Sequence, residues 1–345
     1  MKTLKDISWQ VDEPIYRGDP ALSYSTLARF AREGFNNIDN LYEKIDTPSL
    51  TFGSAVDALI TGGQEEFDRN FFVAEFPPLT ESGEKMVKAL FERHCTDCYL
   101  LGAIPDADII SLSEEIKYQL NWKPETRAKV IKEKGSEYYS LLHAAGERKI
   151  VSTAFKEDVD HCVMALRVSD ATAKYFNPFN NTYERYYQLK FKATLNGVDY
   201  RCMADLLAVD HKNKVIYPID LKTSGHPEWD FFDSFVQWNY QIQARLYWRI
   251  IRHNLDQDET FKDYELADYK FIVVNRKTLT PLVWRFDSTK ALGTMYFGEN
   301  RQIEMKDPED LGKELSIYLS SRPKVPIGID MTGENNLIVW LNKKK

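Results

Sequence analysis

The segment from Asp205 to Lys222 has the residue types and the spacing that metal-dependent hydrolysis requires. Asp205 lies in one run of strand-forming residues, and Asp220-Leu221-Lys222 ends the next run, fifteen residues after Asp205. Because successive strand side chains point to opposite faces, Asp220 and Lys222 share a face while Leu221 points away. In a hairpin, Asp205 approaches the same place. Two carboxylates and an ammonium group suit a hard divalent cation beside a water or phosphate. We interpret the pattern as a site for phosphodiester hydrolysis.

The acid-x-Lys spacing alone is not specific, because it recurs elsewhere in the chain. The other copies are Glu115/Lys117, Glu147/Lys149, Asp210/Lys212 and Asp268/Lys270. The copy at Asp220 differs because it ends the apolar run 215–219 and precedes a loop of small residues. Charges at the end of a buried strand are costly unless they are partnered or used. An ion pair between Asp220 and Lys222 that only closes the strand remains the alternative.

A long helix predicted over about residues 229–253 carries further candidates. At 100° per residue, Gln243 falls in its apolar stripe, with Tyr247 one turn further on. An amide in this stripe can orient a water, a lysine or a phosphate oxygen, although a buried glutamine satisfied by backbone is equally consistent. Three arginines lie about 180–240° from Gln243, so a solvated face or a subunit contact is expected for them: Arg245, Arg249 and Arg252.

The regular elements predicted around these residues form a mixed α/β fold. Ser23 is expected to cap a helix through Ala31. Aromatic and alternating residues predict strands over 183–193, 198–209 and 214–222, with Asn196-Gly197 as a hairpin turn. Pro218 cannot donate to a ladder, so the third strand should be locally an edge or bulged there. Further strands are expected over 269–275 and 282–286, and a helix over 308–321.

These motifs together resemble the PD-(D/E)XK nuclease superfamily, in its RecB-type and phage exonuclease branch. The motifs are Asp205, then Asp220-Leu221-Lys222-Thr223-Ser224, then Gln243-Ala244-Arg245-Leu246-Tyr247. The segment 52–59 resembles the Gly-(Thr/Ser)-x-x-His helix of that branch, and 23–27 resembles its opening segment. The resemblance extends over about residues 22–250 and is greatest to the nuclease domain of exonuclease VIII (RecE-like) and related phage exonucleases.

The resemblance implies roles for individual residues. Asp205, Asp220 and the carbonyl of Leu221 would be metal ligands. Lys222 would hold the attacking water or the developing charge, with Gln243 and Tyr247 in support. Glu184 occupies the place of an additional acid in some members, although an exposed strand glutamate is the alternative.

The chain departs from the family pattern at Asp57, where histidine is frequent. A carboxylate there would favour Mg²⁺, with Mn²⁺ as a substitute, while a helix-surface aspartate is the alternative. No cysteine follows Cys202, so the iron–sulfur cluster of some RecB-type members is not expected. Cys95 and Cys98 form a pair, but the other cysteines are isolated, so helix packing is favoured over zinc.

Basic residues on the predicted strands are the candidates for contacts with DNA phosphates. These are Lys190, Lys192 and Arg201, with Thr223 and Ser224 in the following loop. The formal net charge of −7 excludes a surface coated with nucleic acid but not a locally positive groove.

The bulk properties are those of an ordinary globular chain. The 345 residues are 43% hydrophobic and 28% charged, with four cysteines. No apolar run is long enough for a membrane span, and the first residues lack the core of a secretory signal. With four cysteines in this length, a reducing cytoplasm is expected, and the resemblance implies a bacterial, phage-type protein.

The fold class expected is α/β with a restriction-endonuclease-like core, a mixed central sheet flanked by helices. One nuclease domain is expected over 1–345. Its parts are a mostly helical 1–165 that donates Asp57, a catalytic sheet and Gln-x-x-x-Tyr helix over 180–290, and C-terminal helices over 291–345.

The expected function is Mg²⁺-dependent exonuclease activity on linear double-stranded DNA in phage-type recombination. The resemblance implies a single-strand annealing protein as partner and a homo-oligomeric ring. Two alternatives stay open: a RecB-type nuclease of repair or CRISPR adaptation, and a DNA-binding or recombination-partner module that has lost catalysis.

Overall fold

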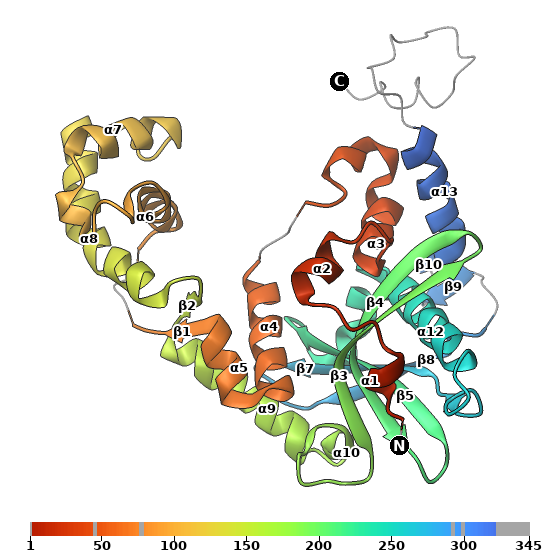
Figure 1. Cartoon of the computed structure of the whole chain (residues 1–345). Helices are drawn as coiled ribbons and strands as arrows, with labels where there is room; N and C mark the ends of the chain where they lie inside the picture. The colour runs from red at the N-terminus through yellow and green to blue at the C-terminus, as the bar shows by residue number, and fades with distance from the viewer. Residues whose placement is uncertain (1, 44–46, 76–78, 291–293, 298–300, 322–345) are drawn as a thin grey trace, which may run out of the picture. The chain divides into compact units, whose positions relative to one another are not determined.

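The chain divides into two compact units. The structure, a computed structural model, describes residues 2–43, 47–75, 79–290, 294–297 and 301–321. One unit combines Met1–Thr51 with Met164–Lys345, and the other is Phe52–Val163. The first carries the sheet and the second is mostly helical (Figure 1). That both act as one nuclease domain stays a prediction.

The first unit is built on a mixed six-stranded sheet, as the sequence predicts. The order is β3-β4-β5-β7-β8, with β6 pairing to β5 beside this path. Strand β5 is parallel to β6 and β7, and the other pairs are antiparallel. The strands are β3 (Glu184–Leu195), β4 (Val198–Asp210), β5 (Val215–Ser224), β6 (Glu265–Leu266), β7 (Tyr269–Asn275) and β8 (Leu282–Phe286).

The turn and the proline behave as their chemistry requires. Asn196 and Gly197 have φ of 49° and 80°, the two left-handed residues of a tight hairpin. Pro218 pairs with Leu207 on its β4 side. On the other side, pairing to β6 ends at Ile216 and pairing to β7 begins at Ile219. Pro218 therefore lies at a local edge inside the sheet, which confirms the expectation for it.

The face that β4 turns toward the main core changes at Asp205. Before that residue the core positions of β4 are Tyr200, Cys202 and Ala204, and after it they are Leu207 and Val209. Between Ala204 and Leu207 the alternation of side chains between the two faces therefore shifts by one residue. In a regular strand, residues an odd number of positions apart lie on opposite faces.

The slip in β4 is matched on the neighbouring strand. Opposite Asp205, the β3 ladder skips Gln188, whose φ is 53°. Both strands therefore depart from regular geometry at the same level, between the pairs Tyr187–Leu206 and Leu189–Ala204.

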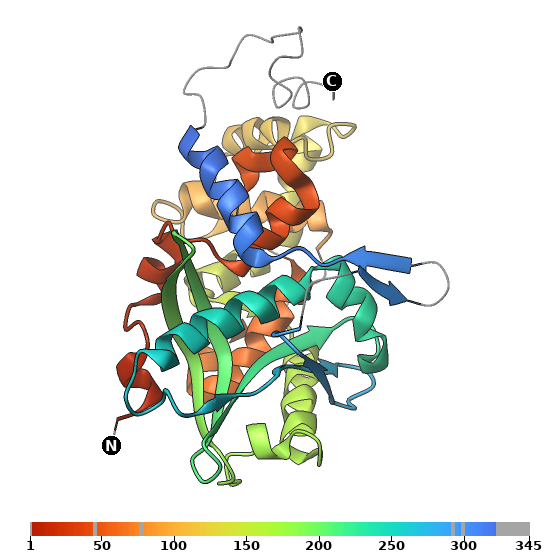
Figure 2. The ribbon, with the colours of Figure 1, turned by 90° about the vertical axis from the view of Figure 1, so that its right-hand side faces the viewer.

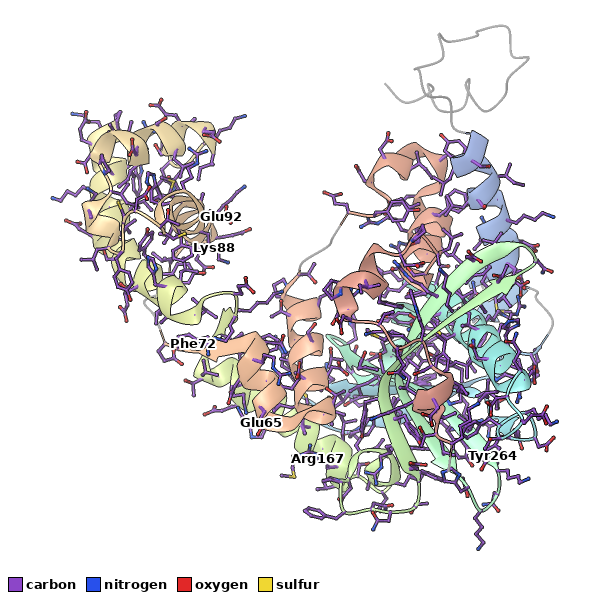
Figure 3. The ribbon with its side chains drawn as sticks, in the orientation of Figure 1. Glu65, Phe72, Lys88, Glu92, Arg167 and Tyr264 are labelled. Atoms are coloured by element: carbon purple, nitrogen blue, oxygen red, sulfur yellow. The ribbon has the colours of Figure 1, made fainter. Side chains whose placement is uncertain are left out.

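Helix α12 (Tyr240–Asp256) lies across one face of this sheet, beside β3 and β4 (Figure 2). Side chains fill the space between them (Figure 3). The predicted single helix over 229–253 is wrong in one respect: it is divided into η3 (Glu228–Asp230), α11 (Phe231–Gln237) and α12. The division falls at Asn239, which has φ 54°, a left-handed conformation that asparagine tolerates.

The other elements of this unit lie at its two ends in sequence. Ser23 caps α3 by accepting the Thr26 N–H, as predicted, and the helix 308–321 is confirmed. These elements are α1 (Leu4–Ile7), α2 (Glu13–Gly18), α3 (Tyr24–Glu33), η1 (Gly34–Asn40), α10 (Ala173–Phe176), β9 (Thr294–Phe297), β10 (Arg301–Glu304) and α13 (Pro308–Ser321). The antiparallel pair β9–β10 was not expected in a C-terminal part predicted to be helical.

The arginines on the back of α12 are structural rather than solvated. Arg245 is 2% exposed and donates to the carbonyls of Ser288 and Lys290. Arg249 pairs with Asp307 and Glu309. These contacts attach the C-terminal segments to α12, so the expected solvated face is wrong.

The second unit is a helical layer with a two-stranded parallel pair. Its main core lies between α6, α7 and α8. The elements are α4 (Pro48–Thr61) and α9 (Thr153–Val168), which both cross the boundary, and α5 (Gly63–Asn70), β1 (Phe71–Val73), α6 (Glu81–His94), η2 (Leu101–Ala103), α7 (Asp106–Glu115), α8 (Pro124–Ala145) and β2 (Lys149–Val151). Among the described helices of the whole chain, none combines the length and apolarity of a membrane span.

Lys270 is a charged residue buried on the face of the sheet opposite α12. It is 8% exposed, and its Nζ lies 4.2 Å from the centre of the Tyr217 ring. Burial, followed by the positive charge of Arg285, lowers its pKa from 10.5 to about 8, although Asp268 opposes the change.

We predict that Lys270→Met stabilises the protein at pH 7. Below about pH 8 Lys270 is protonated in both the folded and the unfolded protein, and the folded protein bears a buried positive charge. Between about pH 8 and 10.5 Lys270 is protonated only in the unfolded chain. The wild-type free energy of unfolding therefore rises with pH in this range. Urea unfolding should show a gain of about 1–3 kcal/mol at pH 7 that shrinks towards pH 10. The exposed Lys262→Met is the control, and a gain independent of pH would contradict the account.

Candidate active site

The Asp220 carboxylate is the centre of the candidate site and is buried, with 1% of the residue exposed. It lies on β5 on the face that α12 covers, and Gln243 Nε2 donates to its Oδ1. Lys222 Nζ lies 2.6 Å from its Oδ2. Each oxygen therefore faces a positive or donor group, which is what a buried carboxylate needs. The predicted convergence of Asp220, Lys222 and Gln243 is present in the structure.

Asp205 reaches the same place by a backbone contact. Regular pairing of β4 with β5 ends at Leu206–Ile219. One residue further on, Asp205 Oδ2 accepts the N–H of Leu221 at 3.0 Å. A side-chain oxygen thus takes the position of a ladder carbonyl where the two strands separate. This contact brings the second predicted acid next to Asp220-Leu221-Lys222.

Lys222 is held as an ammonium ion between a carboxylate and an aromatic ring. Its side chain is 20% exposed, and Nζ lies 4.5 Å from the centre of the Tyr240 ring. Burial alone would lower the pKa of Lys222, but the charge of Asp220, together with Tyr240, Asp205 and Tyr24, raises that pKa overall. The amine therefore carries its positive charge at neutral pH and can stabilise an anion.

Several tyrosines surround these charged groups. Burial raises the pKa of Tyr247 and of Tyr269 well above their ordinary value, and the charges of Asp220 and Asp205 add to this. The two rings are 6.4 Å apart. Tyr247, predicted as a supporting residue, thus lies near both carboxylates as a neutral hydroxyl.

Sequence reasoning missed three tyrosines at this site. Tyr269 faces the carboxylates from β7, and Tyr240 lies one turn before Gln243 on α12. Tyr24, the first residue of α3, has its pKa raised by burial while the charge of Lys222 opposes the rise. The i, i+3 spacing of Tyr240 and Gln243 was the one available signal.

Two buried oxygen atoms of the site have no hydrogen-bond partner among the described residues, as expected for atoms that could face a hard cation. Gln243 Oε1 is buried and has no donor among the described residues. Asp220 Oδ2 contacts Lys222 without hydrogen-bond geometry. These are oxygen atoms, with the Asp205 carboxylate close by at the Leu221 N–H, and oxygen ligands are those that Mg²⁺ and Mn²⁺ prefer. Among the described residues no group of three or more His, Cys, Asp or Glu side chains is arranged as a metal site.

Two further acids, Asp57 and Glu184, were predicted as metal ligands. Asp57 is half-buried on α4 within the second unit, and its role as a ligand stays a prediction. Glu184 pairs across the sheet with Val209, four residues along β4 from Asp205, and its carboxylate contacts His211. The structure thus gives Glu184 a partner at the far end of β3, and the expectation of an additional metal-site acid there is not supported.

The basic strand residues predicted to contact DNA instead hold the N-terminal segment. Lys190 donates to the Val11 carbonyl, and Lys192 pairs with Asp19 at 2.9 Å. Arg201 is 8% exposed and donates to the carbonyls of Tyr16 and Asp19. Their donors are therefore used within the fold, and contacts of these residues with DNA phosphates stay a prediction.

The remaining predicted residues lie outside the charged cluster. Thr223 and Ser224 end β5 against β7, and the Ser224 hydroxyl accepts the N–H of His226 at 3.0 Å. Cys95 and Cys98 are free thiols of the second unit, in the turn after α6.

Comparisons with known proteins give distant structural similarity alone. No family model and no curated protein matches the chain. A solved structure from Eubacterium rectale named "Putative exonuclease" aligns with 14% sequence identity and a TM-score of 0.42, covering 90% of this chain and 85% of that one.

We predict that Gln243→Leu destabilises the folded chain. The substitution removes the donor to a buried carboxylate, which should cost about 1–3 kcal/mol. Urea unfolding at pH 7 measures the change, and the exposed Gln237→Leu at the end of α11 is the control. Equal stabilities of the two variants would show that the contact with Asp220 does not contribute.

Proposed function

We propose that the chain is a metal-dependent nuclease that hydrolyses phosphodiester bonds of DNA. The observation that carries the proposal is that Asp205 accepts the Leu221 N–H while Lys222 pairs with Asp220, so that two carboxylates and one ammonium group lie together where β4 and β5 separate. Acidic oxygens hold a cation, and the ammonium group stabilises negative charge, so the set suits phosphate chemistry.

The cation would be held by Asp205, Asp220 and the carbonyl of Leu221, with Mg²⁺ as the first candidate and Mn²⁺ as a substitute. When bound, it would polarise the scissile phosphate and lower the pKa of a coordinated water. Gln243 holds the Asp220 carboxylate in place from α12, through a hydrogen bond donated by its side-chain amide. Its unpartnered Oε1 is placed to accept a hydrogen bond from a water near the carboxylate.

Lys222 contributes charge rather than proton transfer. Because its pKa is raised, it stays protonated throughout the neutral range and is a poor general base. Its ammonium group contacts Asp220 in the resting site. It can shift towards the non-bridging phosphate oxygens as negative charge develops on them.

The resemblance supplies the finer expectations. These are processive degradation of linear double-stranded ends, a role in phage-type recombination, a ring-shaped homo-oligomer and a single-strand annealing partner. The resemblance also implies that Asp57 supplies a third carboxylate to the cation. Each rests on the motifs and is open to separate tests.

We predict that Asp220→Asn and Lys222→Ala reduce cleavage of end-labelled linear duplex DNA in Mg²⁺ by at least about 100-fold. The first removes ligand charge while keeping the shape of the buried side chain, and the second removes the positive charge. Circular dichroism verifies folding, and Lys262→Ala on the surface is the control. Full activity in either site variant would eliminate the mechanism.

We also predict that Asp57→Ala weakens binding of Mn²⁺ measured by titration calorimetry. The matched control is Asp68→Ala, an exposed aspartate of α5 in the same unit. Affinity unchanged relative to that control would return Asp57 to the class of ordinary helix-surface residues.

A further inference from the structure

Trp238 is an exposed aromatic residue close to the candidate site. It is 42% exposed and lies at the break between α11 and α12, two residues before Tyr240. The Tyr240 ring is the one that contacts Lys222. The left-handed Asn239 ends α11 at this point and leaves the indole outside the packed stripe.

The position of Trp238 is fixed from the neighbouring helix. The Tyr24 hydroxyl donates to the Trp238 carbonyl at 2.7 Å, and the rings of Tyr24 and Tyr240 are 6.2 Å apart. Tyr24 therefore connects the start of α3 to the helix break. An indole that is exposed on a fixed backbone offers a ring on which a nucleic-acid base can stack.

Arg32 places a positive charge on this indole. Its guanidinium carbon lies 5.2 Å from the centre of the Trp238 ring. The charge of Arg32 also opposes the rise in pKa that burial causes at Tyr24 and Tyr240, which shows that it lies near both hydroxyls. The rings of Tyr240, Tyr24 and Trp238 thus lie between two positive charges, Lys222 at one end and Arg32 at the other.

Arg32 differs from three other basic residues near the sheet. Lys192, Arg201 and Arg249 all have carboxylate or carbonyl partners within the fold. Among the residues that the structure describes, no carboxylate pairs with Arg32, and its contact is the Trp238 ring. Its charge is therefore not neutralised by a carboxylate among the described residues.

We propose that Arg32 and Trp238 form a platform for an unpaired nucleotide of the substrate strand. The inference deepens the proposed nuclease function and rests on it for the direction of the strand towards Lys222. A base stacks on the indole, and Arg32 contacts the adjoining phosphate. Stacking on an aromatic ring beside a cation binds single strands with little sequence preference. The ligand class is therefore single-stranded nucleic acid, such as a frayed or overhanging end.

The test is binding of a fluorescein-labelled oligothymidylate of about 12 nucleotides to the full chain, followed by anisotropy. EDTA is present, so that no cleavage occurs whether or not the chain is a nuclease. Trp238→Ala should bind about 5- to 100-fold more weakly than wild type. Trp238→Phe, which keeps a ring, should fall between them. Arg32→Met should lower the slope of log affinity against log salt by about 0.7.

The matched control is Trp229→Ala, because Trp229 is also exposed, at 57%, and lies on the same stretch of chain. Equal binding by the Trp229 and Trp238 variants would overturn the platform. Loss of binding that Trp238→Phe does not restore in part would do the same. If Trp238-dependent binding holds but the wild type cleaves no DNA, the nuclease proposal fails and the binding site stands.

Discussion

The structure around the candidate site depends on burying one carboxylate in the middle of an internal strand. Asp220 is almost fully buried, and a carboxylate there is tolerated only when its oxygens face a donor or a positive charge. Lys222 places its ammonium group beside Oδ2 from the same strand face, and Gln243 donates to Oδ1 from α12. The helix must therefore lie in one register over β5. The break at Asn239 allows this, because it lets α12 begin in a new direction after α11.

The second acid arrives through an irregularity in the sheet. Asp205 lies where β4 changes the face it turns to the core, opposite the left-handed Gln188. Its carboxylate accepts the Leu221 N–H at the end of the β4–β5 ladder. A regular strand would have used that N–H in a ladder bond. Irregular pairing thus brings acidic oxygens to the strand end, as bulges near active sites do in general.

The parts of this arrangement that depend on neighbouring residues could be predicted from the sequence, and the parts that depend on distant residues could not. Asp220 and Lys222 share a face because strand alternation is local, and the Asn196-Gly197 turn follows from backbone preference. The role of Arg201 could not be inferred, because its partners lie more than 180 residues away in sequence. The break at Asn239 was also hidden, since the hydrophobic stripe continues across it. For the same reason Trp238 was counted as part of a helix.

The central claim is that Asp205 and Asp220 share one cation, and a crystal structure of the protein soaked in Mn²⁺ tests it most directly. The account predicts an anomalous peak within about 2.5 Å of a carboxylate oxygen from each residue, with Lys222 Nζ still next to Asp220. A peak elsewhere, or carboxylates that diverge with Mn²⁺ present at saturation, would contradict it.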